Sequence, residues 1–331
     1  MNIPNMLKRP VCVIDVGAVG NLPFHWMPLQ QHIDLIGFEP DAKECSLLNS
    51  QEHKFKKAVF HPFAIGEASA RQVINITSYN ECCSILKPNL DWLTRFDYGE
   101  YFEVVDQIEV EVKALDGIPE IPNEVDAIKI DSQGMELPIL RGADQKLCDI
   151  FLIEVETGLH KNYHGETTFD EIAPYLREKG FMCMEIKSQP HQRRKNSAKN
   201  WEASKGQSMA CESIWVQDLL SSNSPLSENM NKEKLFSILS LCWLFGYSDY
   251  ALELIDQKTF GILLEEKEKT AVDNEDAWLK PVPEGDSMSA LTRIIGCLSH
   301  LLPTPARRNL YKHLPQIAEK PNILKKFVGK G

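Results

Sequence analysis

Short apolar runs alternate with amphipathic segments along the first two thirds of the chain. Four of these runs are apolar over most of their length, as strands buried on both faces of a sheet are: residues 11–16, 35–39, 127–131 and 150–155. Helical segments are expected between them, for example at residues 41–50 and 168–179. Strands that alternate with helices predict a doubly wound α/β domain with a mostly parallel sheet.

Later segments extend this pattern. Residues 107–115 alternate apolar and polar positions, and we expect them to join the same sheet. Two more strands are expected at residues 181–186 and 212–216. The segment at residues 189–209 is polar, lacks periodicity and carries the run Arg193-Arg194-Lys195, so we interpret it as a long loop. Long loops inside compact domains often form or cover binding sites.

The pattern changes after the serine-rich run at residues 221–225, which is typical of a linker. Beyond it, apolar residues take helical spacing, and the helical stretches are expected at residues 235–239, 251–255, 287–302 and 310–328. The chain is therefore predicted to have an α/β domain at residues 1–221, followed by a linker and a C-terminal all-α appendage at residues 222–331. An exposed apolar face on that helical tail would favour a homo-oligomer.

The composition excludes several classes of protein. The chain has 331 residues and a net charge of -11, which argues against nucleic acid as the default partner. No stretch approaches the roughly 18 to 20 apolar residues of a membrane span, and no signal peptide is expected. The 9 cysteines are scattered without paired C-x-x-C spacing, so we expect a reduced, cytoplasmic protein and no zinc site. No metal ligands are assigned, and a divalent cation bound by the paired carboxylates Glu154 and Glu156 stays an alternative.

A glycine-containing turn follows the first predicted strand. Asp15 lies at the strand end, and Gly17, Ala18 and Gly20 come directly after it. In a doubly wound sheet, ligands bind beyond the carboxyl ends of the strands, where glycine lets the backbone approach the ligand closely. A helix that follows such a turn also offers unpaired N–H groups to an anionic group. These four residues are therefore candidate cofactor-binding residues.

The second predicted strand ends in Glu39-Pro40-Asp41, about 20 residues beyond the turn. An acidic residue there accepts hydrogen bonds from the ribose hydroxyls of an adenosine cofactor. The nicotinamide pattern G-x-G-x-x-G would begin with glycine at position 15, where this chain has Asp15. An aspartate would repel a pyrophosphate, but it suits the ammonium group of S-adenosylmethionine. The pattern favours a methyltransferase over an NAD(P)-dependent oxidoreductase, which stays the alternative.

Further motifs carry a family resemblance. The stretch at residues 126–136, with Lys129-Ile130-Asp131-Ser132-Gln133-Gly134, resembles the signature of the FkbM family of methyltransferases, and so do the segments at residues 63–66, 140–143 and 151–156. The resemblance covers roughly residues 11–216. It implies a Rossmann-like class I methyltransferase fold, S-adenosylmethionine as cofactor, and O-methylation of sugars or other hydroxylated metabolites. It also places Ala64 beside the cofactor, and it departs from the family at Gln133, where Glu is common.

A hydroxyl acceptor must lose its proton, so a general base is expected within hydrogen-bond reach. Asp131 is the first candidate, although it could instead orient the following turn or contact the cofactor. Strand alternation puts Glu154 and Glu156 on one side of their strand, and Glu156 is nearer the strand end. His160 follows in the next loop and titrates near neutrality.

The sequence leaves the acceptor and one alternative function open. The acceptor is expected to be a small molecule or a glycan, and the sequence does not identify it. A methyltransferase-like scaffold without catalysis, acting through its helical tail, is a further alternative. The intact set of Asp15, Gly17, Glu39 and Asp131 argues against such decay.

Overall fold

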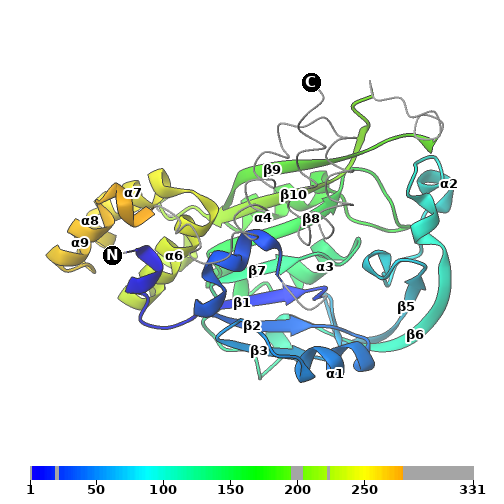
Figure 1. Cartoon of the computed structure of the whole chain (residues 1–331), viewed down its shortest axis with the longest axis horizontal. Helices are drawn as coiled ribbons and strands as arrows, with labels where there is room; N and C mark the ends of the chain where they lie inside the picture. The colour runs from blue at the N-terminus through cyan, green and yellow to red at the C-terminus, as the bar shows by residue number, and fades with distance from the viewer. Residues whose placement is uncertain (1, 19–21, 195–203, 222–223, 279–331) are drawn as a thin grey trace, which may run out of the picture. The chain divides into compact units, whose positions relative to one another are not determined.

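The computed structural model describes residues 2–18, 22–194, 204–221 and 224–278 (Figure 1). Its main sheet has seven strands in the order β3-β2-β1-β7-β8-β10-β9. Their bounds are Val11–Val16 for β1, Ile33–Phe38 for β2, Lys57–His61 for β3, Ala127–Ile130 for β7, Leu152–Gly158 for β8, Phe181–His191 for β9 and Gln207–Gln217 for β10. The first five strands in this order pair in parallel, and β10 runs antiparallel to both of its neighbours. The predicted doubly wound, mostly parallel sheet is confirmed.

Helices cover both faces of this sheet because its central strands are apolar on both sides. On β1, Val11 and Val13 face one buried cluster, while Ile14 and Val16 face the other. The first face is covered by α1 (Ala42–Ser50), by the 3-10 segments η1 (Ile3–Met6) and η2 (Phe24–His32), and by the C-terminal helices. The second face is covered by α3 (Glu136–Arg141) and α4 (Phe169–Glu178).

The helix ends follow from local sequence. The Asp41 side chain caps α1 by accepting a hydrogen bond of 2.8 Å from the Lys43 N–H. Thr168 and Glu171 form a capping box at the start of α4. The helices expected at residues 41–50 and 168–179 are confirmed.

Two predicted elements differ in the structure. Residues 107–115 were expected in the main sheet, but they fall in β6 (Val104–Lys113), whose neighbours are β4 (Ala64–Ile65) and β5 (Ala70–Thr77) in a separate three-stranded sheet. The reason is the long antiparallel pairing of β6 with β5, from Ala70↔Val112 to Thr77↔Val104. The α-helix expected after the first glycine turn is the 3-10 segment η2, where Pro23 and Pro28 remove backbone donors.

The predicted loop at residues 189–209 is shorter than expected. The strand β9 continues to His191 and β10 begins at Gln207, so both ends of the expected loop belong to paired strands. At its start, Arg193 forms an isolated bridge with Phe96. Lys195 lies outside the described residues.

The remaining helical elements connect the strands or follow β10. They are α2 (Leu90–Leu93), η3 (Asn80–Cys82), η4 (Gly99–Phe102), η5 (Leu115–Gly117), η6 (Lys146–Cys148), η7 (Pro225–Asn229), α6 (Lys232–Phe245), α7 (Ser248–Asp256), α8 (Lys258–Gly261), α9 (Glu266–Val272) and η8 (Glu275–Trp278). Among the described residues no helix is both long enough and apolar enough to cross a membrane. The cytoplasmic location expected from the cysteine pattern stays a prediction.

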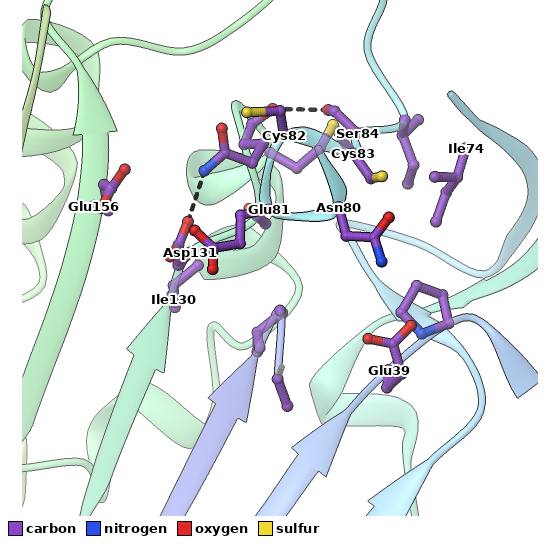
Figure 2. A pocket seen from close by; sticks show the side chains of 18 of the residues that line it. Glu39, Ile74, Asn80, Glu81, Cys82, Cys83, Ser84, Ile130, Asp131 and Glu156 are labelled. Atoms are coloured by element: carbon purple, nitrogen blue, oxygen red, sulfur yellow. Dashed lines mark hydrogen bonds between the residues drawn. The ribbon is translucent and has the colours of Figure 1, made fainter. Parts of the chain in front are cut away.

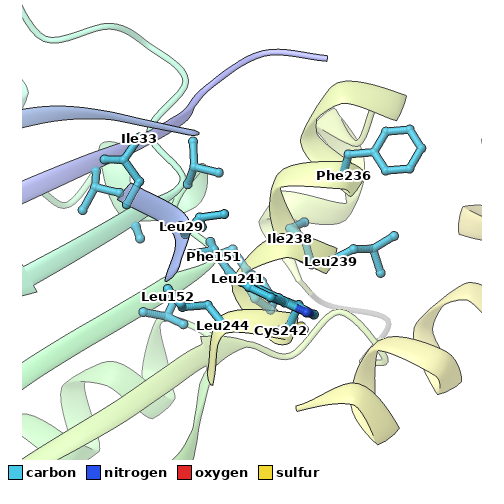
Figure 3. Packing of buried hydrophobic residues seen from close by; sticks show 14 of the residues in the cluster. Leu29, Ile33, Phe151, Leu152, Phe236, Ile238, Leu239, Leu241, Cys242 and Leu244 are labelled. Carbon is cyan, nitrogen blue, oxygen red and sulfur yellow. The ribbon is translucent and has the colours of Figure 1, made fainter. Parts of the chain in front are cut away.

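The first C-terminal helix packs directly against the sheet domain. Nearly every residue of α6 is buried, and Figure 3 shows its side chains facing Leu29, Phe151 and Leu152. A helix that is apolar on all sides must be covered on all sides. One compact unit therefore comprises Met1–Ala198 and Lys205–Leu279, which extends beyond the domain boundary expected at residue 221. The helices expected at residues 287–302 and 310–328 lie outside the described residues.

Candidate functional site

A cavity of about 1010 Å³ opens at the carboxyl edge of the parallel strands. Its volume is at the upper end of the range for small-molecule sites in proteins. Most of the site residues expected from the sequence line it: Gly17, Ala18, Glu39, Pro40, Ala64, Asp131 and Glu156. Figure 2 shows the carboxylates of Glu39, Asp131 and Glu156 on three different strands of the sheet. Sheet order thus brings together residues that are far apart in the sequence.

The turn after β1 requires glycine at position 17. Gly17 has a φ of 81°, and a Cβ built on it would lie 1.9 Å from the backbone oxygen of Asp131. Both the conformation and the close approach exclude a side chain. The backbone of the turn after β1 therefore packs directly against the backbone at the end of β7. Gly20 lies outside the described residues.

Glu39 lies directly after β2, which is the neighbour of β1 in the sheet, so it lies beside the Gly17 turn. Burial raises the pKa of its carboxyl to about 7, and one hydrogen bond of 2.8 Å from the Asp41 N–H partly offsets this effect. A half-buried carboxylate that accepts only one hydrogen bond is stabilised in its charged form by further hydrogen-bond donors. Two ribose hydroxyls would supply them, so the expected role of Glu39 fits the geometry.

Asp15 was expected to contact a ligand ammonium, but it does not line the cavity. Its carboxylate is 1% exposed and lies 3.4 Å from the Nζ of Lys129 on the neighbouring strand. Burial raises the pKa of Asp15 to about 6, although Lys129 opposes this shift. The physical reason for the difference is that Lys129, which does line the cavity, already supplies the cation.

Asp131 is held in place by a network around an unusual backbone turn. Gln133 has a φ of 56°, and its side-chain Nε2 donates to Asp131 Oδ1 at 2.9 Å. The Tyr163 hydroxyl lies 2.9 Å from Gln133 Oε1, and Ser84 Oγ donates to the Gln133 carbonyl at 2.7 Å. Backbone in this region is costly for a residue with a side chain, so the surrounding bonds must stabilise it. Gln133 therefore orients the Asp131 carboxylate.

Glu154 and Glu156 both line the cavity, as strand alternation predicts. Burial and the nearby Asp131 charge raise the pKa of Glu156 to about 8. Its Oε2 accepts a hydrogen bond of 2.8 Å from Gln189 on β9. A carboxyl group with a pKa near neutrality suits proton transfer.

The sequence of residues 20–183 matches the model of the methyltransferase FkbM domain. Residues 20–183 form an FkbM-type methyltransferase domain. The match includes Glu39, Asp131 and Glu156, and it ends within β9. No curated protein matches the chain in sequence.

Several solved structures of methyltransferases are similar to this chain at low identity. One is a TehB-like SAM-dependent methyltransferase from Corynebacterium glutamicum, with a TM-score of 0.32, 10% identity, and coverage of 65% of this chain and 85% of that chain. Another is TrmK of M. capricolum in complex with S-adenosyl-homocysteine, with a TM-score of 0.33, 9% identity, and coverage of 79% and 89% respectively. A SAM-dependent methyltransferase from Methanosarcina mazei has a TM-score of 0.32 and 9% identity, covering 65% and 96%.

Two other candidates lie outside the cavity of the methyltransferase domain. His160 was expected as a base, but it does not line the cavity, and its ring lies 5.0 Å from that of Trp92. The His160 side chain is exposed, and its Nε2 lies 2.9 Å from Nε2 of Gln207 instead. Glu136, the first residue of α3, is also outside the cavity lining, because its carboxylate accepts hydrogen bonds from the N–H groups of Ser132 and Gly134.

The residues on one side of the methyltransferase cavity are not predicted from the sequence. It is formed by η3, η4 and their flanks, which contribute Tyr79, Asn80, Glu81, Tyr98 and Tyr101. The rings of Tyr79 and Tyr101 lie 5.1 Å apart, and both side chains are exposed. No short motif joins these residues, because the hairpin of β5 and β6 brings them together. The recurrence of tyrosine at positions 79, 98 and 101 was the one available signal.

Proposed function

We propose that this protein transfers a methyl group from S-adenosylmethionine to a hydroxyl of a sugar, a glycan or another hydroxylated small molecule. One observation carries the proposal. The cavity that holds Gly17 and Glu39 at one end also holds the Glu156 carboxyl, whose pKa is about 8. Cofactor-binding groups and a candidate base therefore share one space.

The cofactor end of the cavity fits an adenosine group linked to an amino acid. Glu39 has acceptor capacity for ribose hydroxyls, and the missing Cβ of Gly17 lets the β1 turn approach a ligand. The carboxylates of Asp131 and Glu154 add negative potential that favours a cationic ligand. When bound, S-adenosylmethionine supplies an electrophilic methyl group on a sulfonium, so the protein chiefly positions the reactants.

Glu156 is the better candidate for the base. Asp131 accepts from Gln133 and lies 3.6 Å from Lys129 Nζ, so its charge is already compensated. Glu156 has one neutral donor, Gln189, and a raised pKa. As the acceptor oxygen bonds to the methyl carbon, its proton passes to the Glu156 carboxylate. Asp131 then has a positioning and electrostatic role.

The aromatic side of the cavity supports a ring-shaped acceptor. Tyr79 and Tyr101 present exposed rings at the cavity wall, and Asn80 and Glu81 supply polar groups between them. Aromatic faces with adjacent hydrogen-bonding groups suit a sugar ring, which has both apolar and hydroxylated surfaces.

The test uses the purified full chain and S-adenosylmethionine that carries a labelled methyl group. Calorimetry should detect cofactor binding, and Glu39→Gln should weaken it about tenfold or more. Incubation with a panel of hydroxylated sugars and metabolites should transfer label to at least one member, as an alkali-stable ether. Cofactor binding without transfer to any hydroxyl, or transfer only to nitrogen, would overturn the O-methylation proposal.

A further inference from the structure

Three potential metal ligands converge at the end of the cavity formed by β8 and β10. They are His25 from η2, Glu154 from β8 and Glu212 from β10, and one ligand atom of each lies within 4.8 Å of the other two. Glu154 pairs with Ile214 in the strand register and Glu212 pairs with Glu156, so both carboxylates project from the same face. Glu154 and Glu212 line the cavity.

The central carboxylate of this group is buried and held by other residues. The Glu154 side chain is 3% exposed, and its Oε2 lies 3.1 Å from His25 Nε2. The same oxygen accepts a hydrogen bond of 2.5 Å from the Trp26 indole N–H. Metal-binding carboxylates are commonly oriented by such a second hydrogen bond.

Phe245, at the end of the C-terminal helix α6, packs against the rings of His25 and Trp26. The Phe245 ring packs edge-on at 5.4 Å from the His25 ring and at 5.2 Å from the Trp26 ring. His25 is therefore placed by packing as well as by its bond to Glu154. Glu212 is more accessible, with its side chain 25% exposed, and its Oε1 lies 3.4 Å from Lys187 Nζ.

We propose that His25, Glu154 and Glu212 bind a divalent first-row transition-metal ion. One imidazole nitrogen and two carboxylate oxygens suit Mn²⁺ or Zn²⁺, whereas Mg²⁺ prefers oxygen ligands alone. Two ligands of one such ion in tetrahedral geometry lie roughly 3.4 Å apart, which is close to the 3.1 Å between His25 Nε2 and Glu154 Oε2. Three protein ligands leave a coordination position open toward the cavity, as catalytic metal sites do.

The metal also has a place in the reaction, a step that rests on the proposed function. The open position faces the same space as Glu156, so an acceptor hydroxyl can occupy it. A cation held there would lower the pKa of a coordinated acceptor hydroxyl and so ease the loss of its proton. The sequence spacing did not indicate this site, because His25 and Glu154 are 129 residues apart.

The experiment titrates tag-free, chelator-treated full chain with Mn²⁺, measured by the loss of the free-ion electron paramagnetic resonance signal, and with Zn²⁺, measured by calorimetry. We expect one ion per chain, no competition by equimolar Mg²⁺, and at least tenfold weaker binding in His25→Gln and Glu212→Gln. Glu185→Gln is the matched control, because Glu185 also pairs with Lys187 but lies outside the ligand group. Circular dichroism confirms that each variant is folded.

Equal affinity in Glu212→Gln and Glu185→Gln, or no saturable binding of either ion, would overturn the site. S-adenosylmethionine binding is measured on the same samples. Cofactor binding without metal binding rejects this inference and leaves the proposed function standing. Metal binding without cofactor binding keeps the metal site and rejects its role in methyl transfer.

Discussion

The backbone oxygen of Asp131 occupies the position that a side chain on Gly17 would need, since a Cβ there would lie 1.9 Å from it. This contact joins the turn after β1 to the end of β7 under the cavity. It leads to the first prediction. Gly17→Ala should lower the free energy of unfolding by about 2 kcal/mol, because of its φ of 81° and the clash, and should reduce cofactor affinity more than tenfold. Thermal unfolding and calorimetry measure both effects.

Gly117→Ala is the control for this variant. Gly117 is exposed, and a Cβ on it would meet nothing within 4 Å. Its free energy of unfolding should stay within about 0.5 kcal/mol of the parent. Equal behaviour of the two alanine variants would contradict the tight packing at Gly17.

Glu39 should make cofactor binding depend on pH. Its pKa in the free protein is about 7, and only the ionised carboxylate accepts from both ribose hydroxyls. Binding should therefore be strong above pH 7 and become about tenfold weaker between pH 8 and pH 6, as Glu39 takes up a proton. Calorimetry at several pH values measures this, and Glu39→Gln should bind weakly without the pH dependence. An unchanged slope in that variant would show that another group is responsible.

Glu156 should control the proton transfer. Glu156→Gln should lower kcat about 10²- to 10⁴-fold while cofactor affinity changes little. In the parent, kcat/KM should rise with pH through about pH 8, where Glu156 ionises in the free enzyme, and this limb should disappear in the variant. His160→Gln should retain parental activity, because His160 lies outside the cavity lining. Retention of the limb in Glu156→Gln would show that another group is the base.

A buried ion pair links the helix α6 to the sheet. Lys234 Nζ donates to Asp126 Oδ1 at 2.9 Å, and both side chains are at most 4% exposed. Asp126→Asn should destabilise the fold by about 3 to 5 kcal/mol, because it leaves the Lys234 charge buried without its partner. Denaturant unfolding measures this loss, and Asp126→Asn combined with Lys234→Met should recover much of it. The exposed substitution Asp256→Asn is the control.

The same pair predicts how acid affects stability. Burial raises the pKa of Asp126, but Arg9 and Lys234 outweigh burial and hold it below its ordinary value. Since the folded-state pKa is depressed, the contribution is complete above the unfolded-state pKa of about 4 and is lost as pH falls below it. The variant Asp126→Asn should therefore show a smaller loss of stability between pH 5 and pH 2 than the parent.

The sequence by itself determined most strands of the main sheet and the residues that we propose for cofactor binding. The strands β1, β2, β7 and β8 follow from apolar runs, because a strand buried on both faces needs apolar residues throughout. Gly17 and Glu39 follow from short spacings, because a tight turn and a strand end are local features. Residues 107–115 were recognised as a strand but assigned to the wrong sheet, since periodicity does not encode a strand's partner.

Tertiary structure alone decided which of the candidate residues meet. Strand order placed Lys129 beside Asp15 and withdrew that carboxylate from the cavity, and contacts with Trp92 and Gln207 hold His160 outside the cavity lining. It also brought His25 to Glu154 across 129 residues of sequence and buried α6 against the sheet. These outcomes depend on contacts between distant segments. A local pattern can show that a residue is charged or apolar, but the packing of the whole sheet decides what that residue faces.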